Sequence, residues 1–514
     1  MIDTPHWQLR PARGLPESRL AWIAEIPKAG GEILVNCGSM VELADNWLVE
    51  GCWDGDFSAG NFDQCPNFFG SGIRLAADSV ICCSSEALVD RLLYADFADR
   101  LIVSNSLIHL LAATGAKLDT GHDYFQECHG ILEGVKSYPK RFHVTHSELD
   151  YFYQVYASNL VITGKDIQQV PRPQHQHIGS FEEYFELITQ SLESLHSNAT
   201  SDQRSWPFNI YSTLSSGYDS TAVTCLAMDI GASACFTTEP GNTAKSRNLE
   251  DGRRIADFLQ LEAVLLDPED ESVSEDEAYY LAPTWDGSEV IFDNMSRYIE
   301  KDDRPAMVLT GYHGDKIWDR ETSGKYLGDD IFRGDTSGLN LSEIRLKAGF
   351  INLAVPFMFA RNAKDIVGIA NQPEMRQWQL NSDYDRPVPR RIAEQYGVQR
   401  DWFGQRKRAV LSYHSTPINK VLHREFMHFL KYTAGISPWR FYLYELCGTA
   451  DHYFVYFLKK LMPHKNFKDF SWSTGKFLFR QDLDLRLLMF IWAASYLSDR
   501  VIIDKATDAT HDSG

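Results

Sequence analysis

Short apolar runs alternate with stretches of helical periodicity through the middle of the chain. The apolar runs at residues 208–214, 233–238, 263–266 and 306–309 predict strands, and residues 220–229, 249–261 and 295–300 between them predict helices. Because parallel strands are joined by crossover helices, this alternation predicts a parallel sheet covered by helices on both faces. From about residue 341 onward we expect mostly helix, which gives an α/β domain with a helical C-terminal part.

The residues before this region have a different pattern. Short apolar runs at residues 32–35, 72–75, 79–83, 100–104 and 160–163 are separated by Gly, Asp and Asn, and a helix is expected at the end of residues 103–114. This predicts a strand-rich α+β domain over residues 1–165. The polar residues 167–177, which include two prolines, are expected to be a linker, and a helix is expected at 181–195. Residues 166–207 would then connect the first domain to a second one at 208–514.

Composition limits the classes of function. The 514-residue chain has a formal net charge of −20, whereas a nucleic-acid-binding surface needs a basic footprint. No apolar run reaches the roughly 18–20 residues that a membrane span needs, and residues 1–14 carry no signal-peptide pattern. The nine cysteines form no CxxC pair and no Cys/His spacing suited to zinc, and most of them are expected to be buried. We therefore expect a cytoplasmic protein that binds neither nucleic acid nor a membrane.

Residues 215–220, with the sequence SSGYDS, lie between the first predicted strand and the first predicted helix of the α/β region. Small residues at such a turn let backbone N–H groups approach a phosphate, and the helix N-terminus adds the positive end of a dipole. The hydroxyls of Ser215, Ser216 and Ser220 can donate to phosphate oxygens, whereas Asp219 would need a divalent cation between itself and a phosphate. Taken alone, the loop is equally well explained as an ordinary Ser/Gly turn with a helix cap.

Four motifs along the chain resemble one family. Residues 215–220 are similar to the SGGxDS pyrophosphate-binding loop (PP-loop) of the ATP pyrophosphatase superfamily, with Ser216 in place of the first glycine. Residues 308–316 resemble the LSGEGxDE stretch of asparagine synthetase, residues 355–357 resemble its VPF motif, and residues 384–408 resemble its lysine-containing closing segment. On these motifs the chain is identified as a member of the asparagine synthetase-like family, near the β-lactam synthetases and lasso-peptide cyclases.

The resemblance implies an N-terminal domain similar to the class II glutamine amidotransferase fold. Asparagine synthetase carries there a glutaminase whose nucleophile is an N-terminal cysteine, whereas this chain begins Met1-Ile2-Asp3 and its first cysteine is Cys37. A nucleophile that uses its own α-amino group as the base cannot be internal without processing. Residues 100–107 still resemble a segment common in amidotransferase-fold domains. We therefore expect a degenerate domain that does not hydrolyse glutamine, and an unrelated α+β domain stays open as the alternative.

The resemblance also implies a chemistry for the PP-loop synthetase domain. A substrate carboxylate attacks the α-phosphorus of ATP, pyrophosphate leaves, and an amine then attacks the adenylate to form an amide. Asp219 and Asp315 are expected to bind Mg²⁺, and Lys407 is expected to stabilise negative charge in the transition state. The residues expected to bind the phosphates of ATP are Ser215, Ser216, Gly217, Asp219, Ser220, Thr310 and Gly311.

The attacking amine must lose a proton. Asparagine synthetase has a glutamate after the Thr/Ser-Gly pair, but this chain has Tyr312, and in this it resembles the β-lactam synthetases, where a tyrosine works beside a glutamate. A tyrosine with a pKa of about 10 is a poor base alone, so a carboxylate partner is expected. Glu343 lies at about the right distance downstream to be that partner, and His313 is a second candidate base.

We therefore expect an ATP- and Mg²⁺-dependent, AMP-forming carbon–nitrogen ligase that joins a small-molecule or peptide carboxylate to an amine, within one molecule or between two. An ammonia-dependent asparagine synthetase is a second interpretation, which Tyr312 and the lack of an N-terminal cysteine disfavour. A non-catalytic ATP-binding protein is a third, which the presence of Asp219, Asp315 and Lys407 disfavours. A homodimer, and a precursor peptide or leader protease as partner, stay open.

Overall fold

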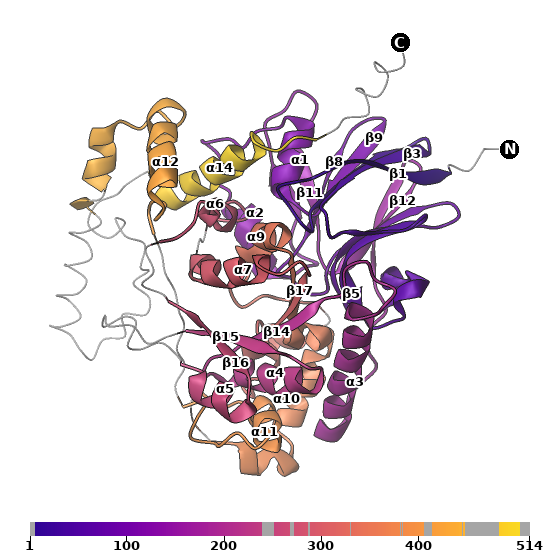
Figure 1. The fold of residues 1–514 in the computed structure, drawn as a ribbon, viewed down its shortest axis with the longest axis vertical. Coiled ribbons are helices and arrows are strands. Elements are labelled where there is room, and N and C mark those ends of the chain that lie inside the picture. The colour runs from indigo at the N-terminus through magenta and orange to yellow at the C-terminus, as the bar shows by residue number, and fades with distance from the viewer. Residues whose placement is uncertain are drawn as a thin grey trace.

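Two mostly antiparallel sheets are followed along the chain by a parallel sheet with helices, so the protein is mixed α/β (Figure 1). This confirms the strand-rich N-terminal part and the parallel sheet that the sequence pattern predicts. The structure is a computed structural model, and it describes residues 6–238, 251–267, 272–285, 288–328, 330–380, 382, 384–405, 414–444, 446–447 and 483–503.

The N-terminal part contains two sheets packed face to face (Figure 1). In spatial order the first holds β1 (Trp7–Gly14), β3 (Gly31–Cys37), β2 (Trp22–Pro27), β9 (Arg100–Ser104), β8 (Leu92–Asp96), β11 (Tyr151–Val155) and β10 (Arg141–His143). The second holds β13 (Asp166–Pro171), β12 (Ser158–Thr163), β7 (Val80–Cys83), β6 (Phe68–Leu75), β5 (Trp47–Trp53) and β4 (Glu42–Leu43). Neighbouring strands are antiparallel except β1 and β3. A shared core forms where Trp22 and Val35 of the first sheet pack with Leu48 and Ile73 of the second.

The predicted linker at residues 167–177 is wrong in its first half. β13 pairs with β12 along its whole length, from the pair of Thr163 with Asp166 to the pair of Ser158 with Pro171. The side chains of β13 are exposed or half-buried, so the strand lacks the buried apolar alternation by which a strand is recognised in a sequence. It is an edge strand that main-chain hydrogen bonds hold in place, and edge strands tolerate proline and polar residues.

A five-stranded parallel sheet forms the centre of the second part. In spatial order it contains β16 (Glu262–Leu266), β15 (Ala234–Thr238), β14 (Asn209–Thr213), β17 (Ala306–Thr310) and β18 (Phe350–Ala354). The predicted helices are α4 (Tyr218–Asp229), α5 (Arg253–Leu259) and α7 (Asp293–Glu300); α5 ends before its predicted end because Gln260 is left-handed, with φ of 58°. The chain runs from β14 outward to β16 and then returns to β17 on the other side of β14. The carboxyl ends of β14 and β17 therefore form the topological switch point of the sheet.

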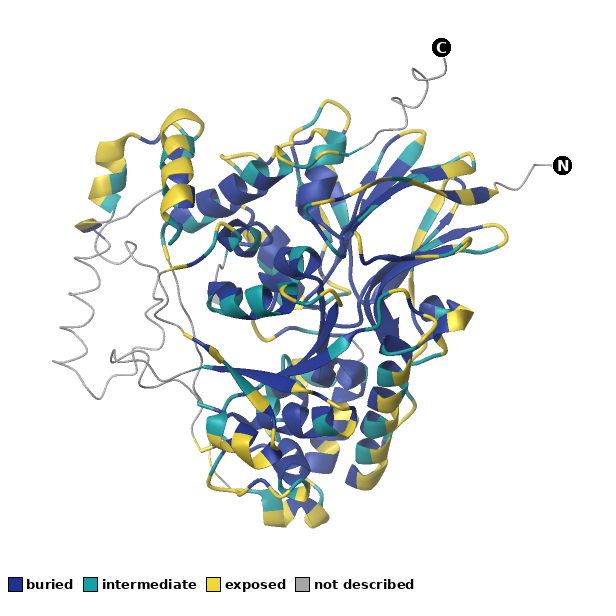
Figure 2. Ribbon diagram, viewed as in Figure 1, coloured by how far each residue is buried: buried dark blue, intermediate teal, exposed yellow. Residues whose placement is uncertain are grey.

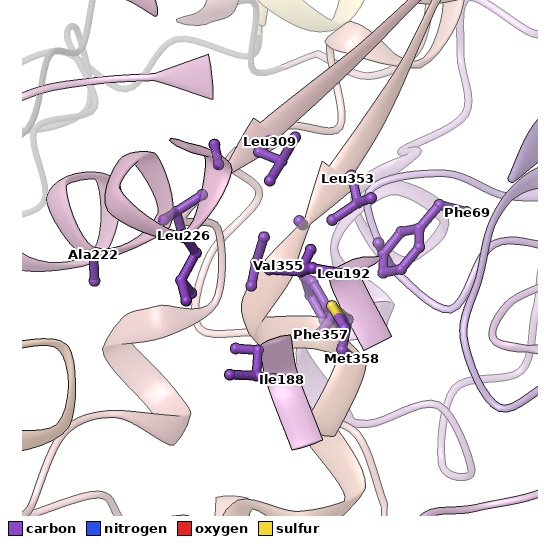
Figure 3. Close-up of a cluster of buried hydrophobic side chains, with 14 of the residues drawn as sticks. Phe69, Ile188, Leu192, Ala222, Leu226, Leu309, Leu353, Val355, Phe357 and Met358 are labelled. Atoms are coloured by element: carbon purple, nitrogen blue, oxygen red, sulfur yellow. The ribbon is translucent and has the colours of Figure 1, made fainter. Parts of the chain in front are cut away.

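Alternate residues of the parallel strands face different helical layers. Leu309 of β17 lies in the core that β17 shares with α4 and with α3 (Phe181–Ala199), and Leu226 of α4 belongs to the same cluster (Figure 3). Val308, the residue before it, lies in another core with Ile299 of α7. The inner strands of this sheet are largely buried (Figure 2), β17 in all of its residues, as the cover on both faces of a parallel sheet requires, whereas the edge strand β16 is mostly exposed or half-buried.

The edge strand β18 is an exception to the mostly helical structure expected beyond residue 341. All five of its residues are buried, and Gly349 ends the preceding helix α9 (Leu341–Ala348) with φ of 89°. A short run that is buried on both faces shows no alternation, so periodicity does not distinguish it from a helix. The remaining prediction is confirmed by α10 (Ala363–Ala370), α11 (Pro387–Gln395), α12 (Lys420–Tyr432) and α14 (Leu485–Ser498).

The last helices pack against the N-terminal part. α14 shares a buried cluster with α1 (Leu107–Thr114) and α12, in which Leu110, Phe426 and Ile491 meet. Within the residues that the structure describes, no helix has both the length and the apolar character needed to cross a membrane. Eight of the nine cysteines are buried and Cys37 is partly buried, which confirms the packing role expected for most of them.

A buried arginine joins the N-terminal sheets to the parallel-sheet part. Arg345 of α9 donates from Nη1 to Glu50 Oε2 (2.9 Å) and from Nε to Asp90 Oδ1 (2.6 Å), and these side chains are at most 5% exposed. Ser71 Oγ (2.6 Å) and Asn105 Nδ2 (3.2 Å) also donate to Glu50 Oε1. Buried charges destabilise a fold unless they are paired and hydrogen-bonded, and here both carboxylates are. The network fixes α9 relative to β5 and β6.

A protein in which Arg345 is replaced should therefore be less stable. We expect Arg345→Met to lower the free energy of unfolding by ~3–5 kcal/mol, because two carboxylates would stay buried without their cation. Urea unfolding followed by tryptophan fluorescence measures this as a lower midpoint. Arg10→Met is the matched control, since Arg10 pairs with Glu32 at the surface with side chains 50% and 62% exposed; it should change the midpoint little. Equal midpoints for the two variants would contradict the role of the network.

Candidate functional site

A cavity of about 350 Å³ opens at the carboxyl ends of the parallel strands. Open parallel sheets bind ligands at such a switch point, and the volume is within the roughly 300–1,000 Å³ range of small-molecule sites. Residues from the ends of β14, β15, β16 and β17 line it, together with residues 333–337 and Arg386. Of the residues singled out from the sequence, those that line the cavity are Ser215, Gly217, Asp219, Ser220, Thr310, Gly311, Tyr312, His313 and Asp315.

The loop between β14 and α4 is tied together by its own serines. Ser215 Oγ lies 2.8 Å from Ser220 Oγ and accepts from the Gly217 N–H (3.1 Å). Gly217 is the N-cap of the twelve-residue helix α4 and offers no capping side chain, so the first N–H groups of the helix face the cavity without a side-chain cap from Gly217. This arrangement suits an anion. Ser216 does not line the cavity; its carbonyl accepts from the Gly404 N–H (2.8 Å).

The loop after β17 lies directly against the first turn of α4. A Cβ atom on Gly311 would lie 2.8 Å from Asp219 Cβ and 2.9 Å from the Ser220 nitrogen, and one on Gly314 would lie 2.5 Å from Asp219 Cγ. Only glycine allows this approach. The approach brings Asp219 against the turn that carries Asp315, so the two carboxylates expected to bind Mg²⁺ come from loops in contact.

Both carboxylates have cationic partners within the protein. Asp219 forms an ion pair with Arg386, and Asp315 Oδ2 accepts from Lys316 Nζ (2.7 Å). No cluster of three or more metal-ligating side chains occurs in the described part of the chain. Mg²⁺ needs only one or two protein carboxylates where substrate phosphates and water complete its shell. Asp219 and Asp315 therefore fit a magnesium ion that arrives with a phosphorylated ligand.

Tyr312 stands beside a carboxylate in the cavity, but that carboxylate is Glu289. Glu289 accepts from the Gly338 N–H (2.7 Å), and a Cβ on Gly338 would lie 3.1 Å from the Tyr312 ring, so Gly338 contacts both residues. Burial and the nearby Glu289 raise the pKa of the Tyr312 phenol above its ordinary value. Burial lowers the pKa of His313 to about 3, so His313 is neutral at physiological pH and a weaker base than an ordinary histidine.

Glu343, the expected partner of Tyr312, does not line the cavity. Glu343 is buried at the interface with the N-terminal part, where its oxygens accept from Ser106 Oγ (2.6 Å) and the Leu107 N–H (2.7 Å). Its carboxylate thus caps the N-terminus of α1. Sequence spacing cannot show which glutamate lies beside Tyr312, because Glu289 precedes it in the chain by 23 residues and Glu343 follows it by 31.

The described part of the segment that resembles the lysine-containing motif packs on the first turn of α4. Tyr384 lies 4.8 Å from Tyr218 and Phe403 lies 5.9 Å from it, measured between ring centroids. The OH of Tyr218 accepts from Arg390 of α11. Lys407, the expected transition-state lysine, lies outside the described residues.

Two arginines and one glutamate in the cavity have no role predicted from the sequence: Arg333, Arg386 and Glu289. Arg386 lies within the motif at residues 384–408, so the sequence could have indicated it as a candidate cation of the site. Arg333 Nη1 donates to the Leu88 carbonyl of the N-terminal part (2.8 Å), a contact between residues 245 positions apart that no local pattern reveals.

No known protein family and no curated protein matches this chain. The arrangement of the cavity residues is therefore the basis for the function proposed below.

The close approach of the two loops gives a direct test. Gly311→Ala should displace the first turn of α4 and cost ~1–3 kcal/mol of stability, because its Cβ would meet backbone atoms that cannot rotate away. Hydrogen exchange should be faster at the amides of residues 219–222. Gly368→Ala in α10 is the control: a Cβ there meets nothing within 4 Å, so the variant should be as stable as the parent or more so. Unchanged exchange in Gly311→Ala would show that the loops do not depend on each other.

Proposed function

We propose that the protein is an ATP-dependent, AMP-forming amide ligase of the asparagine synthetase-like type. The observation that carries the proposal is the convergence of residues 215–220 and 310–315 at the switch point of a parallel sheet, with the N-terminus of α4 facing the cavity. A helix N-terminus suits phosphate. Phe236 of β15 and Leu266 of β16 also line the cavity, and they would contact the adenine ring of ATP.

In the first half-reaction a carboxylate oxygen attacks the α-phosphorus and the bond to pyrophosphate breaks. The N–H groups that follow Gly217 at the start of α4, with the Ser215 and Ser220 hydroxyls, would donate to the departing pyrophosphate. Bound Mg²⁺ would supply further neutralisation of phosphate charge, and Asp219 and Asp315 would hold it.

In the second half-reaction an amine nitrogen attacks the acyl carbon, AMP leaves and the nitrogen gives up a proton. Tyr312 with its raised pKa keeps its own proton at neutral pH, so it can pass a proton on only if a neighbour accepts one. We propose that Glu289 is this acceptor, in place of Glu343. The carboxylate stays beside the phenol because the Gly338 N–H holds one of its oxygens.

We further propose that the N-terminal part is a degenerate amidotransferase-like domain that shapes the cavity and produces no ammonia. In support, Leu88 holds Arg333, and a Cβ on Gly338 would lie 2.9 Å from the Val89 side chain. The connection between β7 and β8 thus contacts the wall of the cavity that carries Arg333 and lies beside Tyr312.

The nucleotide products test the proposed reaction. Incubation with ATP, Mg²⁺, a panel of carboxylic acids and hydroxylamine as the amine should yield AMP, pyrophosphate and a hydroxamate with the acids that fit. Chromatography measures AMP, a coupled pyrophosphatase assay measures pyrophosphate, and exchange of labelled pyrophosphate into ATP reports the reversible first half-reaction. ADP and phosphate as products would exclude the proposed class.

Variants of Tyr312 and Glu289 test the second half-reaction. Tyr312→Phe and Glu289→Gln should leave pyrophosphate exchange largely intact and slow amide formation by about 10²–10⁴-fold, the usual worth of a positioned acid–base group. Glu343→Gln is the matched control: it should lower thermal stability, because it weakens the cap of α1, without separating the two half-reactions. If Glu343→Gln slows only amide formation and Glu289→Gln does not, the assignment of the proton acceptor is wrong.

A further inference from the structure

Arg386 occupies the position next to Asp219 in which the proposed reaction needs a metal ion. The two side chains form an ion pair at the wall of the cavity, with Arg386 3% exposed and Asp219 20% exposed. Arg386 Nε also lies 3.8 Å from Asp319 Oδ2. One guanidinium is thus the cationic partner of the carboxylate that residues 215–220 contribute to the cavity.

Arg386 is the N-cap residue of α11, and its side chain reaches the wall of the cavity. Arg386 precedes Pro387, the first residue of α11, and that helix packs on α4 through Arg390, which donates to the Tyr218 hydroxyl. Its guanidinium also lies 5.1 Å above the Tyr384 ring. Although burial opposes charge, Asp219 and then Tyr384 raise the pKa of Arg386 above its ordinary value, so the side chain stays a cation at any working pH.

An arginine is the side chain best suited to phosphate, because its planar fork donates two parallel hydrogen bonds. Asp219 stands in the first turn of α4, where the N–H groups suit phosphate and the carboxylate itself repels it. When a di- or triphosphate enters, its oxygens compete with Asp219 for Arg386. A divalent cation would in turn compete with Arg386 for Asp219.

We propose that Arg386 exchanges partners during catalysis: it holds Asp219 while the cavity lacks phosphates, and it turns to the pyrophosphate oxygens when a nucleotide binds, which opens Asp219 to a divalent cation. This rests on the proposed function for the identity of the ligand. Two consequences follow from linkage: the cavity without a nucleotide binds the cation weakly, and pyrophosphate and cation strengthen each other's binding by the same factor.

The exchange predicts opposite effects of one substitution on two ligands. Arg386→Gln should weaken binding of inorganic pyrophosphate by about 10–100-fold, the worth of lost charge-assisted hydrogen bonds. The same variant should bind Mn²⁺ alone more tightly, by about 5–10-fold, because Asp219 no longer has an arginine to displace. Calorimetry measures the pyrophosphate affinity of the full-length protein, and loss of the aqueous Mn²⁺ signal in electron paramagnetic resonance measures the metal affinity. Misfolding would lower the affinity for both ligands, so opposite changes in the two affinities distinguish the exchange of partners from a damaged fold.

Arg320→Gln is the matched control, because Arg320 pairs with Asp385 in the same segment (3.0 Å) but does not line the cavity. It should leave both affinities unchanged, and Arg386→Lys should give intermediate values. Weaker or unchanged Mn²⁺ binding in Arg386→Gln would overturn the exchange, as would a parent protein that does not bind pyrophosphate. These measurements involve no turnover: coupled pyrophosphate and Mn²⁺ binding in a protein that forms ADP would refute the proposed reaction and leave the exchange standing.

Discussion

The contact between two glycines and one aspartate is the constraint on which the candidate site depends. Gly311 and Gly314 lack the Cβ atoms that would push the loop after β17 away from Asp219. Parallel strands β14 and β17 bring these loops to the same edge of the sheet, and the glycines then let them touch. This contact sets the arrangement of the two loops: Asp315 and Tyr312 lie on one side of it, and the N-terminus of α4 lies on the other.

The N-terminal part is joined to the parallel-sheet part through α9. Arg345 is bound to both Glu50 and Asp90, and Glu343, on the same helix α9, caps α1. These buried interactions make the position of α9 depend on the N-terminal part, and Arg333, ten residues before Glu343, donates to the Leu88 carbonyl. A domain expected to have lost an ammonia-producing role thus has a structural reason to remain: it supplies one of the hydrogen bonds that hold Arg333 at the wall of the cavity.

What the sequence predicts well is what lies close together along the chain. The strand–helix alternation predicts four of the five parallel strands, because each strand and helix carries its own periodicity. Residues 215–220 and 310–315 are contiguous motifs, and their cavity-lining positions follow once the strands are parallel. The failures concern environment rather than residue type. β18 is buried on both faces, β13 is an edge strand with polar side chains, and Glu343 was paired with Tyr312 on spacing alone, although tertiary packing puts Glu289 there.

The central claim is that the cavity between β14 and β17 binds ATP by its phosphates. A crystal structure with Mg²⁺ and an ATP analogue that cannot be cleaved between the α- and β-phosphorus tests it most directly. The account predicts the triphosphate against the N–H groups at the start of α4, between Gly217 and Gly311, with Arg386 turned from Asp219 to phosphate oxygens. A nucleotide bound elsewhere on the protein, or a cavity that stays without nucleotide at saturating analogue, would contradict it.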